Sequence, residues 1–197
     1  MAKSKDGRDA GWLSLKRAQR TPCELLVEEL EDTEVLPDPF DMGLFINRVE
    51  ERRGRQIRLV AMSASRSTPC GLYIKSKSTD FLCYTHSDSP LHQCHIILHE
   101  LGHLLLDHHD SGWRSEDLHR LLLPDLDPGM IKSVLCRNGY TSPAEDEAEM
   151  FADLILAPRA LTHSFNAVSA TEPPPDIADV IRNIERTWGT QAGRLRD

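Results

Sequence analysis

Two histidines four residues apart, His99 and His103, flank a glutamate in the sequence HELGH. Residues four apart in an α-helix lie on the same face, so both imidazoles could bind one metal ion. The intervening Glu100 would then lie beside a water molecule on that metal and could accept its proton. The pattern therefore predicts a zinc site with hydrolytic chemistry, in which Glu100 is the catalytic residue.

The residues around this motif predict a long buried helix. Ser89 can cap its first turn and Pro90 suits the first helical position, and the helix should end near Leu106. Gly102 leaves room for another backbone or a substrate to approach. Buried imidazoles need polar partners, and a metal ion would satisfy both. The apolar residues that surround the motif are Leu98, Leu101, Leu104 and Leu105. This context favours a metal site over a chance match.

A third ligand is expected from a second helix, because catalytic zinc sites usually have three protein ligands and one open position. A helix should begin at Ser142 and bury Phe151. Glu145 and Glu149 share a face that borders the buried side, whereas Glu147 points elsewhere. Glu145 could instead complete a capping box with Ser142. We expect Glu145 to be the ligand and leave Glu147 as the alternative, a preference that rests partly on the family resemblance given below.

The other histidines have simpler interpretations. His92 and His95 lie on nearly the same stripe as His99 and could be further ligands or supporting donors, but ordinary polar or core positions are favoured. His108 and His109 follow the end of the helix, where its dipole favours a cation. Tyr140 and His109 are both available to stabilise an oxyanion, and the sequence does not choose between them.

A second motif begins at Glu145, where residues 145–158 read ExxAxxFAxxILxP. Together with HELGHLLL at residues 99–106, this two-part signature resembles the ImmA/IrrE family of zinc metalloproteases. The similarity extends upstream and covers roughly residues 40–160. The two motifs together are far more specific than HELGH alone.

The resemblance implies a role for each matching residue. His99, His103 and Glu145 would be the zinc ligands and Glu100 the general base. Glu149 stands where the family often has asparagine, so no role for it follows from the resemblance. Members of the family are usually bacterial or phage-related and typically act on helix-turn-helix repressors.

The remaining patterns predict an α+β fold, in which a small three-stranded sheet packs with helices. A zincin-like metalloprotease core would be followed by a C-terminal helical segment. An amphipathic helix should begin after Phe40 and end at Gly54, and a last helix should begin at Asp176. Residues 111–141 read as irregular, with short helices near His119 and after Asp127. The expected strands are 57–61, 72–74 and 81–84.

We expect three regions along the chain. Residues 1–36 form a peripheral acidic segment, whose carboxylates would make a solvated helix face. Residues 37–160 form the zinc metalloprotease domain. Residues 161–197 form a linker rich in proline and small residues, followed by the last helix.

Composition narrows the class of protein. The 197 residues carry a net charge of -8, which argues against nonspecific binding of nucleic acid. No apolar run is long enough for a membrane span, and the N-terminus lacks the apolar core of a secretion signal. The five cysteines have no paired spacing, which favours reduced thiols in a cytoplasmic protein.

These observations lead to one expected function and its rivals. The leading hypothesis is a cytoplasmic zinc-dependent endopeptidase that cleaves a helix-turn-helix repressor and so switches on gene expression. A regulatory or toxin-like module that acts by binding a partner protein is the main alternative, and a hydrolase with another substrate is a further one. A purely structural zinc is disfavoured, because such sites usually have four protein ligands and more cysteine.

Overall fold

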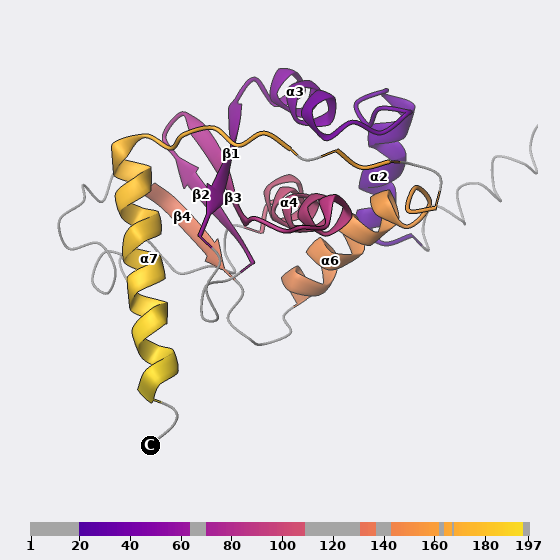
Figure 1. Ribbon diagram of the computed structural model, residues 1–197. Coiled ribbons are helices and arrows are strands. Elements are labelled where there is room, and N and C mark those ends of the chain that lie inside the picture. The colour runs from indigo at the N-terminus through magenta and orange to yellow at the C-terminus, as the bar shows by residue number, and fades with distance from the viewer. Residues whose placement is uncertain are drawn as a thin grey trace, which may run out of the picture.

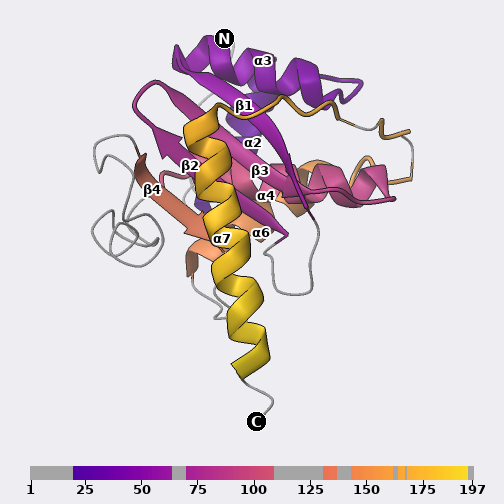
Figure 2. The same cartoon turned by 60° about the vertical axis from the view of Figure 1, so that its left-hand side comes forward.

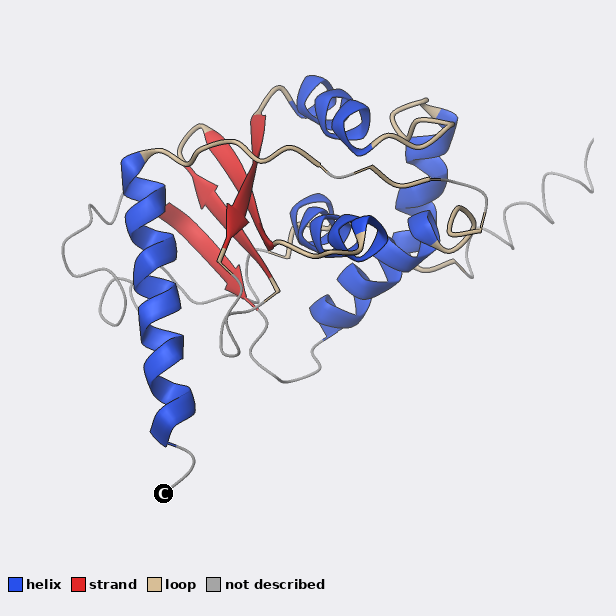
Figure 3. Cartoon of the chain, in the orientation of Figure 1, coloured by secondary structure: helices blue, strands red, loops and turns tan. Residues whose placement is uncertain are grey.

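The computed structural model describes residues 20–63, 70–108, 131–136, 143–161, 164–166 and 168–194. Within these ranges the chain forms an α+β fold in which helices lie on both sides of one sheet (Figures 1 and 3). The helices are α2 (Pro22–Asp32), α3 (Met42–Arg53), α4 (Pro90–Leu105), α6 (Pro143–Leu156) and α7 (Pro175–Arg194).

The sheet has the strand order β1-β3-β2-β4. The three predicted strands are present as β1 (Gln56–Met62), β2 (Gly71–Ser76) and β3 (Thr79–Thr85). β1 pairs with β3 in parallel, whereas β2 is antiparallel to β3. A further strand that the sequence did not predict, β4 (Ile131–Cys136), pairs antiparallel with the free side of β2. β4 lies in a segment read as irregular, and its strand geometry depends on pairing with a distant strand.

Both faces of the sheet are covered. One face places Leu59, Tyr73 and Leu82 in the main hydrophobic core together with α4. The opposite face lies toward α7 (Figure 2), whose Ile177 and Val180 are buried. Burial on both sides explains why successive residues along β2 and β3 are apolar rather than alternating.

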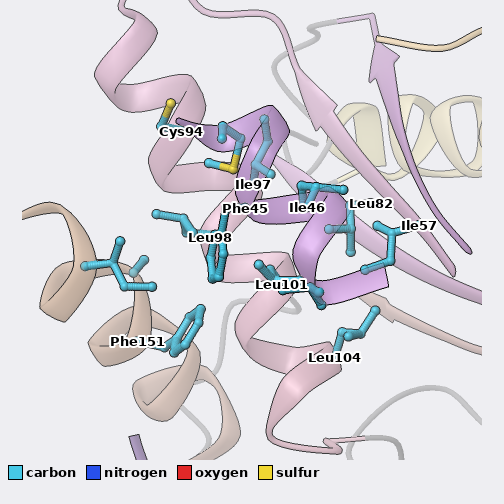
Figure 4. Close-up of a cluster of buried hydrophobic side chains, with 14 of the residues drawn as sticks. Phe45, Ile46, Ile57, Leu82, Cys94, Ile97, Leu98, Leu101, Leu104 and Phe151 are labelled. Atoms are coloured by element: carbon cyan, nitrogen blue, oxygen red, sulfur yellow. The ribbon is translucent and has the colours of Figure 1, made fainter. Parts of the chain in front are cut away.

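α4 is the central helix of the fold and lies between the sheet and α6 (Figure 1). Ser89 caps it by accepting a hydrogen bond from the backbone N–H of His92, and Pro90 is its first residue, as predicted. Its apolar side chains meet the sheet on one side and Phe151 of α6 on the other (Figure 4). The labelled α4 residues of this core are Cys94, Ile97, Leu98, Leu101 and Leu104.

α4 and α6 approach each other closely at Gly102. A Cβ atom added there would lie 3.2 Å from the Cα of Ala148 and 3.2 Å from Cδ1 of Phe151. The sequence-based expectation that Gly102 admits another backbone is confirmed. This contact sets how near the first turn of α6 comes to the histidines of α4.

α2 belongs to the core, which differs from the peripheral position predicted for this part of residues 1–36, whose residues 1–19 lie outside the described residues. Val27 and Leu30 are buried in the main hydrophobic cluster, and the Cys23 thiol donates to the carbonyl of Glu147 at 3.2 Å. The acidic side of the helix is solvated as expected, since Glu24 and Glu29 are exposed. The few apolar residues of this segment fall on one stripe, which is enough to dock the helix against α6.

α3, the helix before the sheet, begins and ends where the sequence predicted. Asp41 caps the N-terminus of α3 through the backbone N–H of Leu44, and Gly54 ends the helix in the left-handed conformation with φ 62°. The helices expected near His119 and Asp127 lie outside the described residues. None of the described helices is long and apolar enough to cross a membrane.

Candidate metal centre

Three potential ligands predicted from the sequence converge at the interface of α4 and α6. The Nε2 atoms of His99 and His103 lie 3.1 Å apart. The two carboxylate oxygens of Glu145 lie 3.4 Å from His99 Nε2 and 3.4 Å from His103 Nε2. These side chains form a group that could hold a metal ion.

The separations fit a tetrahedral metal. Bonds of about 2.0–2.1 Å at tetrahedral angles place neighbouring ligand atoms about 3.3 Å apart. The two imidazole nitrogens lie 3.1 Å apart, and each lies 3.4 Å from a different oxygen of Glu145, which is close to this value. The donor set is two imidazole nitrogens and one carboxylate, which leaves a fourth position for water or substrate.

Each donor is held by a rigid element. His99 and His103 are 8% and 3% exposed, on a helix buried on all sides near the motif. Glu145 lies in the first turn of α6, and its side chain is partly buried. Its competitor Glu147 is directed elsewhere, to His108. The structure thus brings Glu145, not Glu147, to the two imidazoles.

Glu100 is 5% exposed and lies against the start of β2. A Cβ atom at Gly71 would be 2.2 Å from Glu100 Oε1, so only glycine leaves room for this carboxylate. A cleft of about 280 Å³ opens beside it and is lined by Cys70, Gly71, His95, His99 and Glu149, among others. The carboxylate therefore lines a space, together with His99, that a substrate could enter.

The Nδ1 atom of His99, which lies on the ring edge away from the group of ligands, has a carboxylate partner. His99 Nδ1 lies 3.2 Å from Glu149 Oε2, and the other oxygen of Glu149 lies 3.2 Å from His95 Nε2. His95 Nδ1 in turn lies 3.8 Å from Asp153. His95 therefore takes part in the surroundings of the site, which corrects its interpretation as an ordinary polar residue. His92 lines the cleft.

The outer nitrogen of His103 has a different partner. His103 Nδ1 lies 3.0 Å from His108 Nδ1, and His108 Nε2 lies 2.9 Å from Glu147 Oε2. Sequence reasoning missed this role of His108, which it attributed to the helix dipole alone. The spacing of five residues from His103 was the available signal. His109 and Tyr140 lie outside the described residues.

The carboxylates shift the protonation of the ligands. The nearby imidazoles of His103 and His99 hold the pKa of Glu145 far below its usual range, which favours its ionised form. Burial lowers the pKa of His99, but the nearby carboxylates of Glu145, Glu100 and Glu149 outweigh burial and raise it. Burial lowers the pKa of His103. The surplus of negative charge favours a bound cation.

A comparison with family models, curated proteins and solved structures finds no match to this chain. What the fold and the site define is an α+β protein with a buried group of two histidines and one glutamate that could hold a metal ion.

Proposed function

We propose that this protein is a zinc-dependent endopeptidase with a zincin-like core. The observation that carries the proposal is the convergence of His99, His103 and Glu145 within 4.8 Å, with Glu100 lining the same cleft as His99. Zinc is the preferred metal, because two imidazoles and one carboxylate at tetrahedral separations are a typical catalytic zinc donor set. A structural role for the metal does not require an acidic group such as Glu100 facing a cleft.

Zinc in this position would polarise a peptide carbonyl and lower the pKa of water. Glu100 would accept the proton of the attacking water on its carboxylate and pass it to the nitrogen of the leaving amine. Gly71 admits that carboxylate to the wall of the cleft. Glu149 would hold the ring of His99 in place through Nδ1, so that Nε2 is directed at the metal.

The proposed substrate and compartment rest on the sequence motifs and on the cysteines. The two motifs resemble the ImmA/IrrE family, which favours a helix-turn-helix repressor as the protein that is cut. Cleavage of the repressor would switch on gene expression. A cytoplasmic location is consistent with free thiols at Cys23, Cys83 and Cys94, which are buried in the core.

The first experiment measures metal content and repressor cleavage together. The purified chain should contain about one zinc per molecule by inductively coupled plasma mass spectrometry. It should cut a helix-turn-helix repressor encoded beside its own gene, at a bond mapped by mass spectrometry of the fragments. Glu100→Gln should retain zinc and lose cleavage, because the amide cannot accept the proton.

Glu51→Gln, an exposed glutamate on α3, is the matched control and should cut at the wild-type rate. Wild-type cleavage by Glu100→Gln would contradict the assigned role of Glu100. Tight binding of an intact repressor by both the wild type and Glu100→Gln would instead support a module that acts by binding. A chain without affinity for zinc would overturn the metalloprotease proposal.

A further inference from the structure

A chain of hydrogen-bonded side chains lies behind His103, on the side away from Glu145. It runs from His103 Nδ1 to His108 Nδ1 at 3.0 Å, and from His108 Nε2 to Glu147 Oε2 at 2.9 Å. The His108 side chain is 9% exposed, so water has little access to it. We propose that His108 and Glu147 are positioning residues that direct His103 Nε2 at the metal. This inference rests on the proposed metal site.

The donor and the acceptor of each hydrogen bond follow from the carboxylate at one end of this chain of side chains. An ionised carboxylate only accepts, so His108 Nε2 must donate to Glu147. With its proton on Nε2, His108 presents the lone pair of Nδ1 to His103 and accepts the Nδ1–H of that ring. With its proton on Nδ1, His103 has a lone pair on Nε2, the atom that lies 3.4 Å from Glu145. The chain therefore selects the form of His103 that can bind a metal.

Local structure explains how His108 reaches this position. α4 ends at Leu105, Leu106 is its cap, and Asp107 has a left-handed φ of 59°. The backbone N–H of His108 donates to the carbonyl of His103 at 3.1 Å, which is the bond that defines a Schellman ending. This turn folds His108 back against the ring of His103, with the ring centroids 5.2 Å apart.

The two ligands of α4 are thus supported in different ways. His99 meets a carboxylate directly, since its Nδ1 lies 3.2 Å from Glu149. His103 reaches its carboxylate, Glu147, through one intervening imidazole. Both carboxylates come from α6. That helix therefore supplies one donor to the metal group and also orients both imidazoles of the other helix.

His108 is not a fourth ligand in this arrangement. Its Nδ1 faces His103 Nδ1, the nitrogen on the outer edge of that ring, and its Nε2 is taken by Glu147. The group of donor atoms that converge within 4.8 Å comprises His99, His103 and Glu145. The role left for His108 is to act through His103.

The direct test is ¹⁵N NMR of the histidine rings in the wild-type protein loaded with zinc. The expected spectrum shows the ring proton of His108 on Nε2 and an unprotonated, hydrogen-bonded Nδ1. A proton on Nδ1 of His108 would overturn the relay, because two donors would then face each other. This measurement uses the unmodified chain and does not depend on proteolytic activity.

Two variants of His108 separate the hydrogen bond from the volume of the ring. His108→Phe keeps an aromatic ring but has no acceptor, and its zinc affinity should fall about 10- to 100-fold. His108→Asn places an amide oxygen where Nδ1 stood and should bind zinc within a few-fold of the wild type. Affinity is measured by competition with a chromophoric chelator, and thermal unfolding of each metal-free variant confirms that it folds.

The control is His86→Phe, at an exposed histidine in the loop after β3, which should bind zinc like the wild type. Wild-type affinity in His108→Phe, or an equal loss in His108→Asn, would overturn the relay while leaving the zinc site intact. A wild-type chain that does not bind zinc would overturn the relay and the proposed function together. The two failures are therefore distinguishable.

Discussion

The two helices that form the candidate metal centre specify their donors in different ways. α4 carries His99 and His103 one turn apart, so helix geometry places both imidazoles on one face, where their Nε2 atoms lie 3.1 Å apart. α6 supplies Glu145 from its first turn, and this carboxylate reaches the histidines because α6 packs against Gly102. One half of the site is therefore a property of a single helix, and the other half is a property of a helix contact.

The largest effect should come from removing a donor from α4. His103→Ala deletes one of three ligands, and zinc affinity should fall by more than about 100-fold, since changes in supporting residues alone cost about 10- to 100-fold. The measurement is competition with a chelator, with His86→Ala as the control at an exposed histidine. Retention of one tightly bound zinc in His103→Ala would show that the metal is held elsewhere.

The next effect concerns Gly71, the first residue of β2, which lies against Glu100 of α4. In Gly71→Ala the new Cβ would lie 2.2 Å from Glu100 Oε1 and 2.8 Å from Glu100 Cγ, so the carboxylate must move. The turnover number for repressor cleavage should fall about 100-fold, a typical contribution of a positioned general base. Zinc affinity should change little, because Gly71 does not touch the ligands of the metal.

Gly43→Ala is the matched control for this substitution. Its Cβ would meet Asp41 Oδ1 at 3.4 Å, an ordinary contact, so activity should stay at the wild-type level. If Gly71→Ala cut the repressor as fast as Gly43→Ala, Glu100 would not need its present position. Its assignment as the base would then fail.

A smaller effect should follow from loosening the contact between α4 and α6. Gly102→Ala places a Cβ 3.2 Å from the Cα of Ala148, which is backbone and has little freedom to move. Overpacking costs about 1–3 kcal/mol, and the better helix propensity of alanine offsets about 1 kcal/mol. The free energy of unfolding should fall by about 1 kcal/mol, as measured by urea denaturation.

Gly102→Ala also tests whether the metal site depends on the position of α6. Zinc affinity should also fall in Gly102→Ala, because α6 and its Glu145 are pushed away while His99 and His103 stay on one helix. Gly43→Ala is again the control and should bind zinc normally. Unchanged zinc affinity in a destabilised Gly102→Ala would show that the position of α6 does not limit the metal site.

The smallest effect is a difference in thiol reactivity. Burial raises the pKa of both Cys23 and Cys94 to about 11, so at neutral pH they are protonated and react slowly. Exposed Cys70 should be alkylated first, at least about 100-fold faster, as followed by mass spectrometry of the modified peptides. Raising the pH toward 11 should narrow this difference as the buried thiols ionise.

The order in which Cys23 and Cys94 react then shows which helix opens more readily. Cys23 donates to a carbonyl of α6 across the contact between α2 and α6, whereas Cys94 lies within the central helix. We expect Cys23 to react before Cys94, because α6 and α2 can separate locally while α4 stays between them and the sheet. If Cys94 reacted before Cys23, α4 would open locally more readily than the contact between α2 and α6.

The features that sequence reasoning predicted well are those with a local cause. Ser89 and Pro90 mark the start of α4, and Gly54 marks the end of α3, because caps are set by a few neighbouring residues. The three apolar strands followed from their β-branched and aromatic residues. Glu145 was favoured over Glu147 partly from the faces of one helix and partly from the family resemblance, and the structure brings Glu145 to the histidines.

The features that it missed depend on contacts between distant segments. β4 exists by pairing with β2, and no local pattern in residues 111–141 indicated it. The burial of α2 depends on the surface that α6 offers to it. His108 and Glu147 are 39 residues apart in the chain, so their contact could not be read from either neighbourhood.

The amino-acid sequence by itself determined the pair of imidazoles and the acidic residue between them, because an α-helix of known pitch converts spacing into direction. Tertiary structure decided which acidic residue completes the group and which side chains hold the imidazole rings in place. The physical reason is that side-chain hydrogen bonds act over about 3 Å. Only the packing of α6 on α4 determines which atoms come within that distance.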